Sequence, residues 1–272
     1  MTDDRSSTVP PSAREWDAAT YHRVSDPHVG WGQRVLDRLA LRGDETVLDA
    51  GCGSGRLTAL LLERLPRGHV IASDASTNML RAAADALEPR FGGRVTYLQT
   101  DLQTLSLATP VDAIFSTATF HWIPDHPRLF RHLLGALVPG GRLAAQCGGG
   151  PNLARLRDRM APLMASSPFA PCFAGWDGPW TFADDVTTAT RLRDAGFVEV
   201  ATDLESAPTT HAEAEAHRTF LTSVVLGSHL ARLPDDAARH AFVDALVDLA
   251  AGDDPPFALD YWRLNLRAPR PA

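Results

Sequence analysis

A glycine loop between an apolar segment and an amphipathic segment is the feature that most constrains this chain. The stretch ETVLDAGCGSGRLTALLLERL, from Glu45 to Leu65, predicts a strand, a loop with Gly51, Gly53 and Gly55, and a helix. Glycine directly after a strand permits positive φ and lets a ligand approach the backbone. A tight turn without a ligand is the alternative, which three alternating glycines downstream of an acidic residue disfavour. We therefore expect a nucleotide-like ligand at this loop.

Strand and helix patterns alternate along the chain and predict its fold class. Helices are expected at 55–65, 77–87 and 126–137. Strands are expected at 46–51, 69–75, 94–101, 111–120, 142–149, 198–206 and 257–270. Such alternation predicts an α/β, Rossmann-like fold: a seven-stranded, mostly parallel sheet with helices on both faces.

We expect one domain over residues 1–272, with insertions near the ligand. Residues 1–14 are polar and rich in Ser and Pro, and we expect them to be loose. Residues 14–150 form the expected cofactor-binding core. Residues 151–190 and 207–256 are expected to form helical and aromatic lid segments, because insertions on such sheets often cover the crevice at the strand carboxyl ends.

Composition excludes or disfavours several classes of protein. All 26 basic residues are Arg, so neither a P-loop lysine nor a lysine Schiff base is present. The net charge of −7, without a basic run, disfavours nucleic acid as a partner. No signal peptide and no apolar run near ~20 residues occur, so we expect no membrane partner. Three widely spaced cysteines predict reduced thiols and a cytoplasmic location.

Loop spacing and two acidic residues discriminate among nucleotide ligands. The dinucleotide fingerprint G-x-G-x-x-G would place its last glycine on Arg56, which disfavours an NAD-dependent oxidoreductase. Asp74 ends the second strand, where a carboxylate accepts both ribose hydroxyls, or caps the next helix. Asp101 ends the third strand, where it would accept from an adenine amino group. Together they fit an adenosine ligand.

Five motifs resemble those of the class I S-adenosylmethionine-dependent methyltransferases. VLDAGCGSG resembles their motif I, and VIASDAS and TDLQTL are similar to the second- and third-strand motifs. VDAIFSTATFHWIPDH and LLGALVPGGRLAAQ are similar to the fourth-strand and pre-fifth-strand motifs. The resemblance covers about residues 14–150. WDAATYHRVSD together with TATFHWIPDH is similar to the trans-aconitate methyltransferase-like subgroup, which methylates carboxylates of small molecules.

The resemblance implies S-adenosylmethionine as the cofactor and assigns residues to it. Asp49 would anchor the loop and the methionine amino group. Asp74 would bind the ribose, and Asp101 with the backbone of Leu102 would bind adenine. The other cofactor residues that the resemblance implies are Gly51, Cys52, Gly53, Ala75, Met79, Ser116, Thr117, Trp16 and Tyr21. Plain core packing is an equal alternative for the last two.

Methyl transfer from a sulfonium is an in-line displacement that needs alignment and exclusion of water. His121, after the fourth strand, is the candidate general base, because histidine titrates near neutrality; the alternative is a structural histidine that shapes the pocket. A carboxylate acceptor needs no base. The other residues expected at the acceptor are His28, Trp31, Trp122, Phe173 and Trp176. The histidines lack metal-ligand spacing, so we expect no metal.

These observations predict S-adenosylmethionine-dependent methylation of a small-molecule acceptor. O-methylation, with a carboxylate as the first candidate, is the preferred hypothesis. C- or N-methylation and a methyltransferase fold with a non-methylating role stay open, because fold does not determine function. We expect a monomer or a homodimer.

Overall fold

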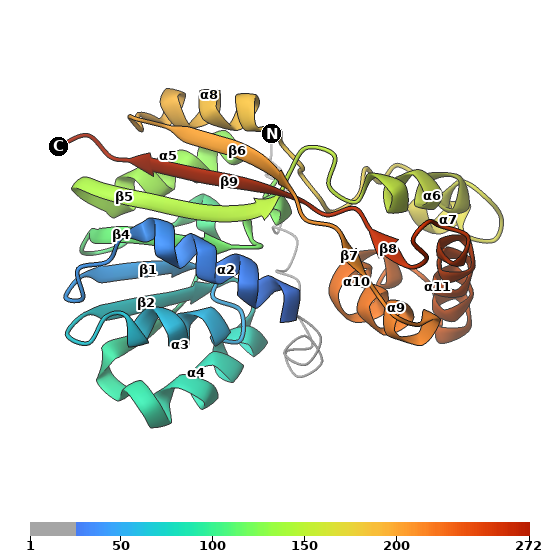
Figure 1. Cartoon of the computed structure of the whole chain (residues 1–272), viewed down its shortest axis with the longest axis horizontal. Coiled ribbons are helices and arrows are strands. Elements are labelled where there is room, and N and C mark those ends of the chain that lie inside the picture. Colours follow the sequence, from blue (N-terminus) through green and yellow to red (C-terminus); the bar gives the residue numbers. More distant parts are fainter. Residues whose placement is uncertain (1–25) are drawn as a thin grey trace, which may run out of the picture.

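A seven-stranded sheet organises the chain in this computed structural model, which describes residues 26–272 and side chains from residue 30 onward. The strands are β1 (Thr46–Ala50), β2 (His69–Asp74), β3 (Val95–Gln99), β4 (Val111–Thr117), β5 (Leu137–Gly148), β6 (Ala201–Ser206) and β9 (Trp262–Pro269). Their order is β3-β2-β1-β4-β5-β9-β6 (Figure 1). Strand β9 runs antiparallel to both β5 and β6, and the pairs from β3 to β5 are parallel. The predicted mostly parallel sheet is confirmed.

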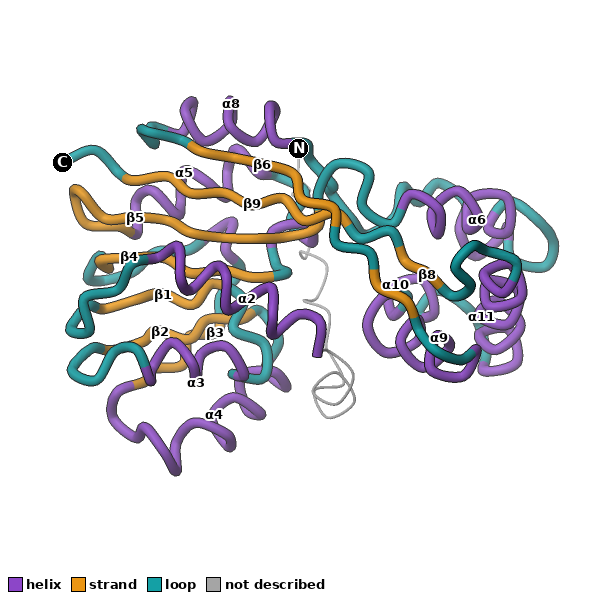
Figure 2. The backbone as a smooth tube through the Cα atoms, in the orientation of Figure 1, coloured by secondary structure: helices purple, strands orange, loops and turns teal. Residues whose placement is uncertain are grey.

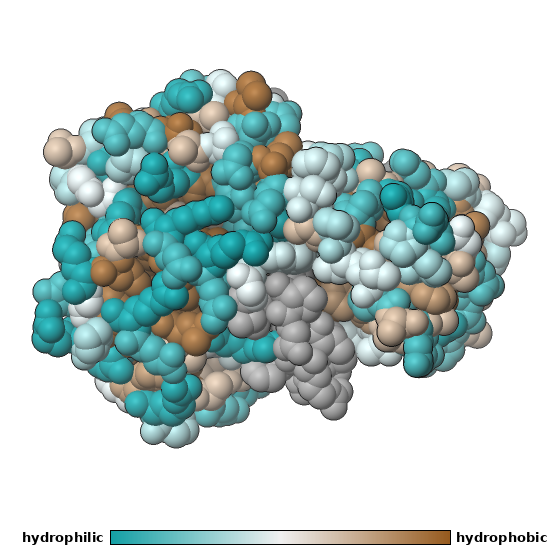
Figure 3. Space-filling view, in the orientation of Figure 1, coloured by the Kyte–Doolittle hydropathy of each residue, from teal (hydrophilic) through white to brown (hydrophobic). Residues whose placement is uncertain are grey.

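Helices cover both faces of the sheet, as predicted. Helices α2 (Asp26–Leu39), α3 (Arg56–Glu63) and α4 (Thr77–Phe91) pack into one apolar core with β1 and β2. Helices α5 (His126–Ala136) and α8 (Asp185–Ala195) pack into a second core on the other face. Three 3-10 turns, at Gly92–Arg94, Leu102–Thr104 and Phe120–Trp122, complete this part. On the face that Figure 3 shows, hydrophilic residues cover most of the helices that flank the sheet.

Side-chain caps fix where the helices begin. The Ser76 hydroxyl accepts a hydrogen bond from the Met79 amide at 3.2 Å, and so begins α4. The Asp125 carboxylate accepts from the Arg128 amide at 2.9 Å and begins α5. Asp184 begins α8 in the same way. Each cap satisfies a backbone donor that a helix N-terminus leaves without a partner.

A helical cap lies beyond the sheet, at the right in Figure 1, and has its own core. It comprises α6 (Ala154–Met164), α7 (Ala170–Phe173), α9 (Ala214–Phe220), a π turn (Leu221–Val225), α10 (Gly227–Leu230), α11 (Asp236–Ala251), β7 (Thr209–Thr210) and β8 (Ala258–Leu259). The tube view shows that helices make up most of it (Figure 2). Two segments far apart in sequence therefore form one unit, which we call the cap.

The structure divides some segments differently from the sequence pattern. The pattern predicts two helices over 211–250, and the first is split into α9, the π turn and α10. The expected strand at 257–270 is split into β8 and β9. Helix α8 lies on the sheet against α5, although part of it falls within the expected lid segment 151–190. The domain boundaries stay a prediction, and the expected loose segment 1–14 lies outside the described residues.

A buried ion pair closes the end of the sheet opposite the cap. The fully buried side chain of Glu45, just before β1, accepts a hydrogen bond from the Arg142 guanidinium on β5. Arg142 also donates to the Leu39 carbonyl at 2.6 Å, at the end of α2. Burial alone would raise the pKa of Glu45, but hydrogen bonds from Arg142 and the Arg42 backbone outweigh it, and the pKa is lowered. This carboxylate therefore stays ionised inside the protein.

Within residues 26–272, no helix combines the length and apolar character needed to cross a membrane.

Candidate active site

The glycine loop is tightly packed at one glycine and open at the next. Gly51 has φ 85° and Gly53 has φ 55°. A Cβ on Gly51 would lie 2.1 Å from Oγ1 of Thr119, so any side chain there would force Thr119 to move. A Cβ on Gly53 would meet nothing within 4 Å. The loop therefore rests on the segment after β4 at Gly51 and offers an approachable backbone at Gly53.

Asp49 lies beneath this loop and is 2% exposed. Its Oδ2 accepts a hydrogen bond from Oγ1 of Thr58 at 2.6 Å. Burial raises the pKa of Asp49 to about 7; the Thr58 hydrogen bond opposes the shift, and the charge of Asp74 adds to it. A cation placed at this carboxyl would favour its ionised form.

Asp74 connects the glycine loop to the start of α4. Its Oδ2 accepts from the Gly53 amide at 3.0 Å, and its Oδ1 accepts from the Ser76 amide at 2.9 Å. A carboxylate offers about four acceptor positions, so two backbone bonds are compatible with ligand hydroxyls. Ala75 beside it is half-buried, and Met79 is buried in the first turn of α4.

The other expected cofactor residues lie at the carboxyl ends of neighbouring strands. Asp101 is exposed, and its Oδ1 accepts from the Gln103 amide at 2.8 Å, which begins the 3-10 turn. Leu102 is buried in the core below it. The Ser116 hydroxyl donates to the Ala50 carbonyl at 2.6 Å, so it ties β4 to β1. The remaining residues at this edge are Cys52, which is buried, and Thr117, which is half-buried.

Three predicted residues cannot be placed in the site. Trp16 and Tyr21 lie outside the described residues, and so does the side chain of His28, although its backbone belongs to α2. Their expected roles stay predictions.

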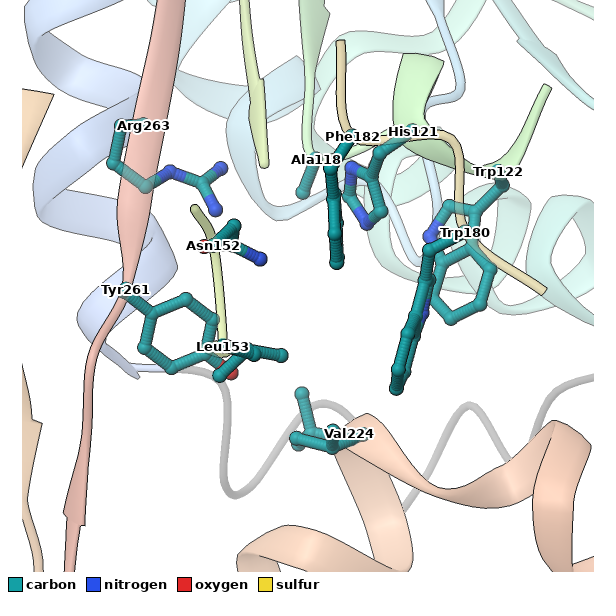
Figure 4. Close-up of a pocket in the computed structure, with 11 residues that line it drawn as sticks. Ala118, His121, Trp122, Asn152, Leu153, Trp180, Phe182, Val224, Tyr261 and Arg263 are labelled. Atoms are coloured by element: carbon teal, nitrogen blue, oxygen red, sulfur yellow. The ribbon is translucent and has the colours of Figure 1, made fainter. Parts of the chain in front are cut away.

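A pocket lies between the strand carboxyl ends and the cap (Figure 4). Including its open mouth, it measures about 430 Å³. The residues that line it are Ala118, His121, Trp122, Asn152, Leu153, Trp180, Phe182, Val224, Val225, Tyr261 and Arg263. Ala118 and Leu153 have φ values of 54° and 56°, which are strained for residues other than glycine. Strained backbone of this kind clusters at ligand sites.

His121 borders this pocket and is 8% exposed. Its Nδ1 lies 3.3 Å from the amide nitrogen of Gly148, at the end of β5. A backbone amide can only donate, so Nδ1 carries no proton, and the neutral ring carries its proton on Nε2. The His121 carbonyl also accepts from the Thr181 amide at 2.8 Å, which holds the segment after α7 near the pocket. In this tautomer the ring presents a donor at Nε2.

Arg263 brings a buried cation to the pocket and is 3% exposed. Figure 4 shows its side chain reaching from β9 toward the space near Asn152. Its guanidinium carbon lies 4.5 Å from the ring centroid of Trp31 in α2. Its Nε donates to Oε1 of Gln146 on β5 at 3.3 Å. Two neighbouring elements therefore fix the direction of the guanidinium.

The structure separates the residues expected at the acceptor. His121 and Trp122 line the pocket. Trp31 lies beneath Arg263 and packs on the Tyr261 ring, with centroids 5.4 Å apart. Phe173 and Trp176 stack on each other at 5.8 Å and belong to the cap core.

Sequence reasoning did not include several residues that line the pocket: Asn152, Leu153, Val224, Val225, Tyr261 and Arg263. No sequence signal identified Arg263. Its alternation with Leu264, Asn265 and Leu266 is typical of a strand with one solvent-facing side, whereas the structure buries both Arg263 and Asn265. A buried arginine requires partners or a ligand.

Among the described residues, no group of three or more His, Cys, Asp and Glu side chains is placed to hold a metal ion.

Comparison with known proteins gives matches of sequence and of fold. A family described as a methyltransferase domain matches residues 47–141. A trans-aconitate 2-methyltransferase of Azoarcus sp. (strain BH72) is 42% identical over 131 residues, which cover 48% of this chain and 50% of that protein. A trans-aconitate 2-methyltransferase of Methylobacterium radiotolerans is 34% identical over 179 residues, covering 65% of this chain and 62% of that protein. The chain thus spans less than two thirds of the length of these relatives.

A solved structure has a similar fold. The phosphoethanolamine N-methyltransferase 2 of Haemonchus contortus, in complex with phosphomonomethylethanolamine and S-adenosylhomocysteine, matches with a TM-score of 0.61 and 19% identity. The match covers 94% of this chain and 57% of that chain.

Proposed function

We propose that this chain, which carries a methyltransferase domain at residues 47–141 and has the class I methyltransferase fold, transfers a methyl group from S-adenosylmethionine to a carboxylate of a small molecule. One observation carries the proposal. A glycine loop joined to Asp74 lies at the same sheet edge as a pocket that holds a buried arginine. The similarity to trans-aconitate 2-methyltransferases supports the carboxylate as the acceptor group.

The residues present fit this cofactor. The loop leaves open space at Gly53, and Asp74 beside it offers the acceptors that a ribose needs. Asp49, whose pKa burial raises to about 7, would ionise against the methionine amino group. Asp101 would accept from the adenine amino group, and Met79 would pack against the adenosine. When bound, S-adenosylmethionine supplies a methyl group on a positively charged sulfur.

The residues of the pocket have three tasks in such a reaction. They hold the acceptor in line with the methyl group, exclude water and stabilise the acceptor until it reacts. No residue has to remove a proton, because a carboxylate is already ionised at neutral pH. His121, which presents Nε2–H, would therefore serve as a hydrogen-bond donor to the acceptor.

Calorimetric titration with S-adenosylhomocysteine tests the cofactor assignment, and absence of binding would refute it. Transfer of labelled methyl from S-adenosylmethionine to a panel of small carboxylic acids tests the reaction. The expected product is a methyl ester, which mild base hydrolyses. A product stable to base would indicate C- or N-methylation.

Two substitutions of His121 separate a donor from a base. In His121→Gln the amide nitrogen occupies nearly the position of Nε2 and can still donate, whereas in His121→Asn the amide lies near Nδ1. A donor role predicts that Gln retains more kcat/KM than Asn. An equal and large loss in both variants, with unchanged cofactor affinity, would favour a general base.

The remaining assignments concern partners and location. We infer a small-molecule acceptor rather than nucleic acid from the net charge of −7, and a monomer or homodimer as the assembly. Light scattering tests the assembly. The three cysteines, Cys52, Cys147 and Cys172, are free thiols, which supports a reducing, cytoplasmic location.

A further inference from the structure

We propose that Arg263 anchors a single carboxylate of the acceptor, and that the rings around it select an acid with a flat, apolar body. This inference rests on the proposed function and names the substrate class for it. The selected class differs from the tricarboxylate named by the relatives, because it carries one charge and an apolar remainder.

Arg263 is held in an orientation suited to a carboxylate. The Trp31 ring packs on the guanidinium at 4.5 Å, and Gln146 accepts from Nε at 3.3 Å. Gln146 in turn donates to Oδ1 of Asn265 at 2.6 Å, and Asn265 donates to Oδ2 of Asp203 at 2.8 Å. This chain of hydrogen bonds fixes the amide of Gln146 and thereby the plane of the guanidinium. A fixed guanidinium plane favours bidentate binding of a carboxylate.

Aromatic rings form much of the rest of the pocket. We call Trp122, Trp180, Phe182 and Tyr261 the aromatic wall. Trp180 and Phe182 stack with centroids 5.5 Å apart and planes 18° apart, and Trp122 lies 6.2 Å from Trp180. Flat rings that pack together in this way offer large apolar contact surfaces to a planar ligand.

Among the residues that the structure describes, apolar side chains form another part of the lining, and Arg263 brings its one permanent charge. Leu153, Val224 and Val225 add further apolar surface. Among the described residues that line the pocket, Arg263 is the only arginine, and the other side chains with polar atoms are neutral: His121, Asn152, Tyr261 and the indoles of Trp122 and Trp180. A tricarboxylate would bring two more carboxylates against rings and valines, where desolvation of a charge is strongly unfavourable.

A second arginine lies near the pocket but does not line it. The Arg157 guanidinium lies 5.7 Å from the Phe182 ring and is exposed to solvent. An exposed guanidinium binds a carboxylate weakly, because water and salt screen the interaction. Arg157 therefore does not change the preference for one anchored carboxylate.

The reaction is balanced without a further reactant. A carboxylate oxygen of the acceptor forms a bond to the methyl carbon, and the bond between that carbon and sulfur breaks. The electron pair of the broken bond stays on sulfur, which becomes the neutral thioether of S-adenosylhomocysteine. No proton is transferred. The ester product is neutral, so it leaves the pocket without the negative charge by which Arg263 held the carboxylate.

The first experiment compares acceptors on the full chain with S-adenosylmethionine. The probes are trans-cinnamate, octanoate and trans-aconitate, assayed by transfer of labelled methyl. We expect kcat/KM to follow the order trans-cinnamate, octanoate, trans-aconitate, with at least about tenfold between the first and the last. Equal or better turnover of trans-aconitate would overturn the inference on selectivity.

The second experiment tests the anchor with a matched control. Arg263→Met should lower kcat/KM for trans-cinnamate about 10- to 100-fold, mainly through KM, because a hydrogen-bonded charge is lost. Arg267→Met alters an exposed arginine on the same strand and should change nothing. Affinity for S-adenosylhomocysteine, measured on each variant, should stay within about twofold and reports correct folding. An unchanged KM in Arg263→Met would contradict the proposal that Arg263 binds the carboxylate of the acceptor.

Two further variants, one of Arg263 and one of the aromatic wall, test the proposal if Arg263→Met folds poorly. Arg263→Lys retains the charge but loses the planar fork, so we expect a partial loss of kcat/KM. Trp180→Ala should reduce the preference for trans-cinnamate over trans-aconitate, and an unchanged ratio would contradict the role of the aromatic wall. If the wild-type chain fails to bind S-adenosylhomocysteine, the proposed function fails. If it binds and esterifies trans-aconitate best, only this inference fails.

Discussion

Replacing Gly51 with alanine should destabilise the protein far more than the same change at Gly53. Both glycines have positive φ, but their surroundings differ. A Cβ on Gly51 would lie 2.1, 2.5 and 2.8 Å from three atoms of the Thr119 side chain, whereas a Cβ on Gly53 meets nothing within 4 Å. The pair therefore separates steric overlap from backbone strain.

The magnitude follows from three contributions. Alanine in the left-handed region costs roughly 1–2 kcal/mol at either position. At Gly51 the Thr119 side chain must also move, and overpacking of this kind costs about 1–3 kcal/mol. Moving it breaks the hydrogen bond from Thr119 Oγ1 to the Thr117 carbonyl at 2.9 Å, a loss of about 1 kcal/mol. We expect about 3–6 kcal/mol for Gly51→Ala and about 1–2 kcal/mol for Gly53→Ala.

Urea unfolding followed by tryptophan fluorescence measures both free energies of unfolding. Thr119→Ala removes two of the three overlapping atoms, so the double variant Gly51→Ala/Thr119→Ala should recover at least about 1 kcal/mol relative to additivity. Gly53→Ala should instead weaken binding of S-adenosylhomocysteine. Equal losses of stability at Gly51 and Gly53, or no coupling to Thr119, would refute the reasoning.

Further predictions concern three carboxylates, those of Asp74, Asp49 and Glu45. Asp74→Asn should weaken S-adenosylhomocysteine binding by about 10- to 100-fold, measured by calorimetry, because the acceptor that we propose for the ribose loses its charge. Burial raises the pKa of Asp49 from 3.8 to about 7. The buried neutral carboxyl therefore makes its full contribution to the free energy of unfolding below pH 3.8, and that contribution is lost as pH rises through 7. The affinity of the protein for S-adenosylhomocysteine, whose amino group is cationic, should conversely rise between about pH 6 and 8, because Asp49 releases its proton on binding. Calorimetric titrations in buffers of different ionisation enthalpy detect this proton. Arg142→Met should lower the free energy of unfolding by about 3–5 kcal/mol at neutral pH. Because the pKa of Glu45 is lowered in the folded state, Glu45 adds stability above pH 4.5, and this stability is lost as pH falls through the folded pKa. The urea midpoint, measured at a series of acidic pH values, should therefore fall less steeply with pH in Arg142→Met than in the wild type.

The positions of the residues around the glycine loop were predictable, because the sequence motifs that indicate them are local. The glycines and Asp74 lie within one strand, loop and second strand, where spacing in the sequence determines proximity in space. Parallel strands also place their carboxyl ends at one edge, which brought Asp101 to the same side. Their binding roles stay predictions.

The pocket between the strand carboxyl ends and the cap was less predictable, because distant segments of the chain form it. Trp180 comes from a loop after α7, Val224 from the π turn and Arg263 from β9, and only packing of the cap brings them together. The π turn has no sequence pattern that distinguishes it from a continuous helix, so the prediction of two helices over 211–250 does not divide the first helix there. Strands β7 and β8 have two residues each, too few for an alternating pattern to appear.

Strand β9 lies between β5 and β6 in the sheet (Figure 1). Strands β5 and β6 nevertheless precede β9 in the chain and are synthesised long before it. Until residues 262–269 emerge, the outer edge of β5 presents unpaired backbone groups beside apolar side chains such as Leu143. Exposed edges of this kind pair readily with other chains, and contacts between distant segments form slowly. We therefore expect the nascent chain to pass through an aggregation-prone intermediate that already holds the glycine loop. When β9 pairs with β5 and β6, that edge is covered, and the same pairing brings Arg263 to the pocket beside the cap.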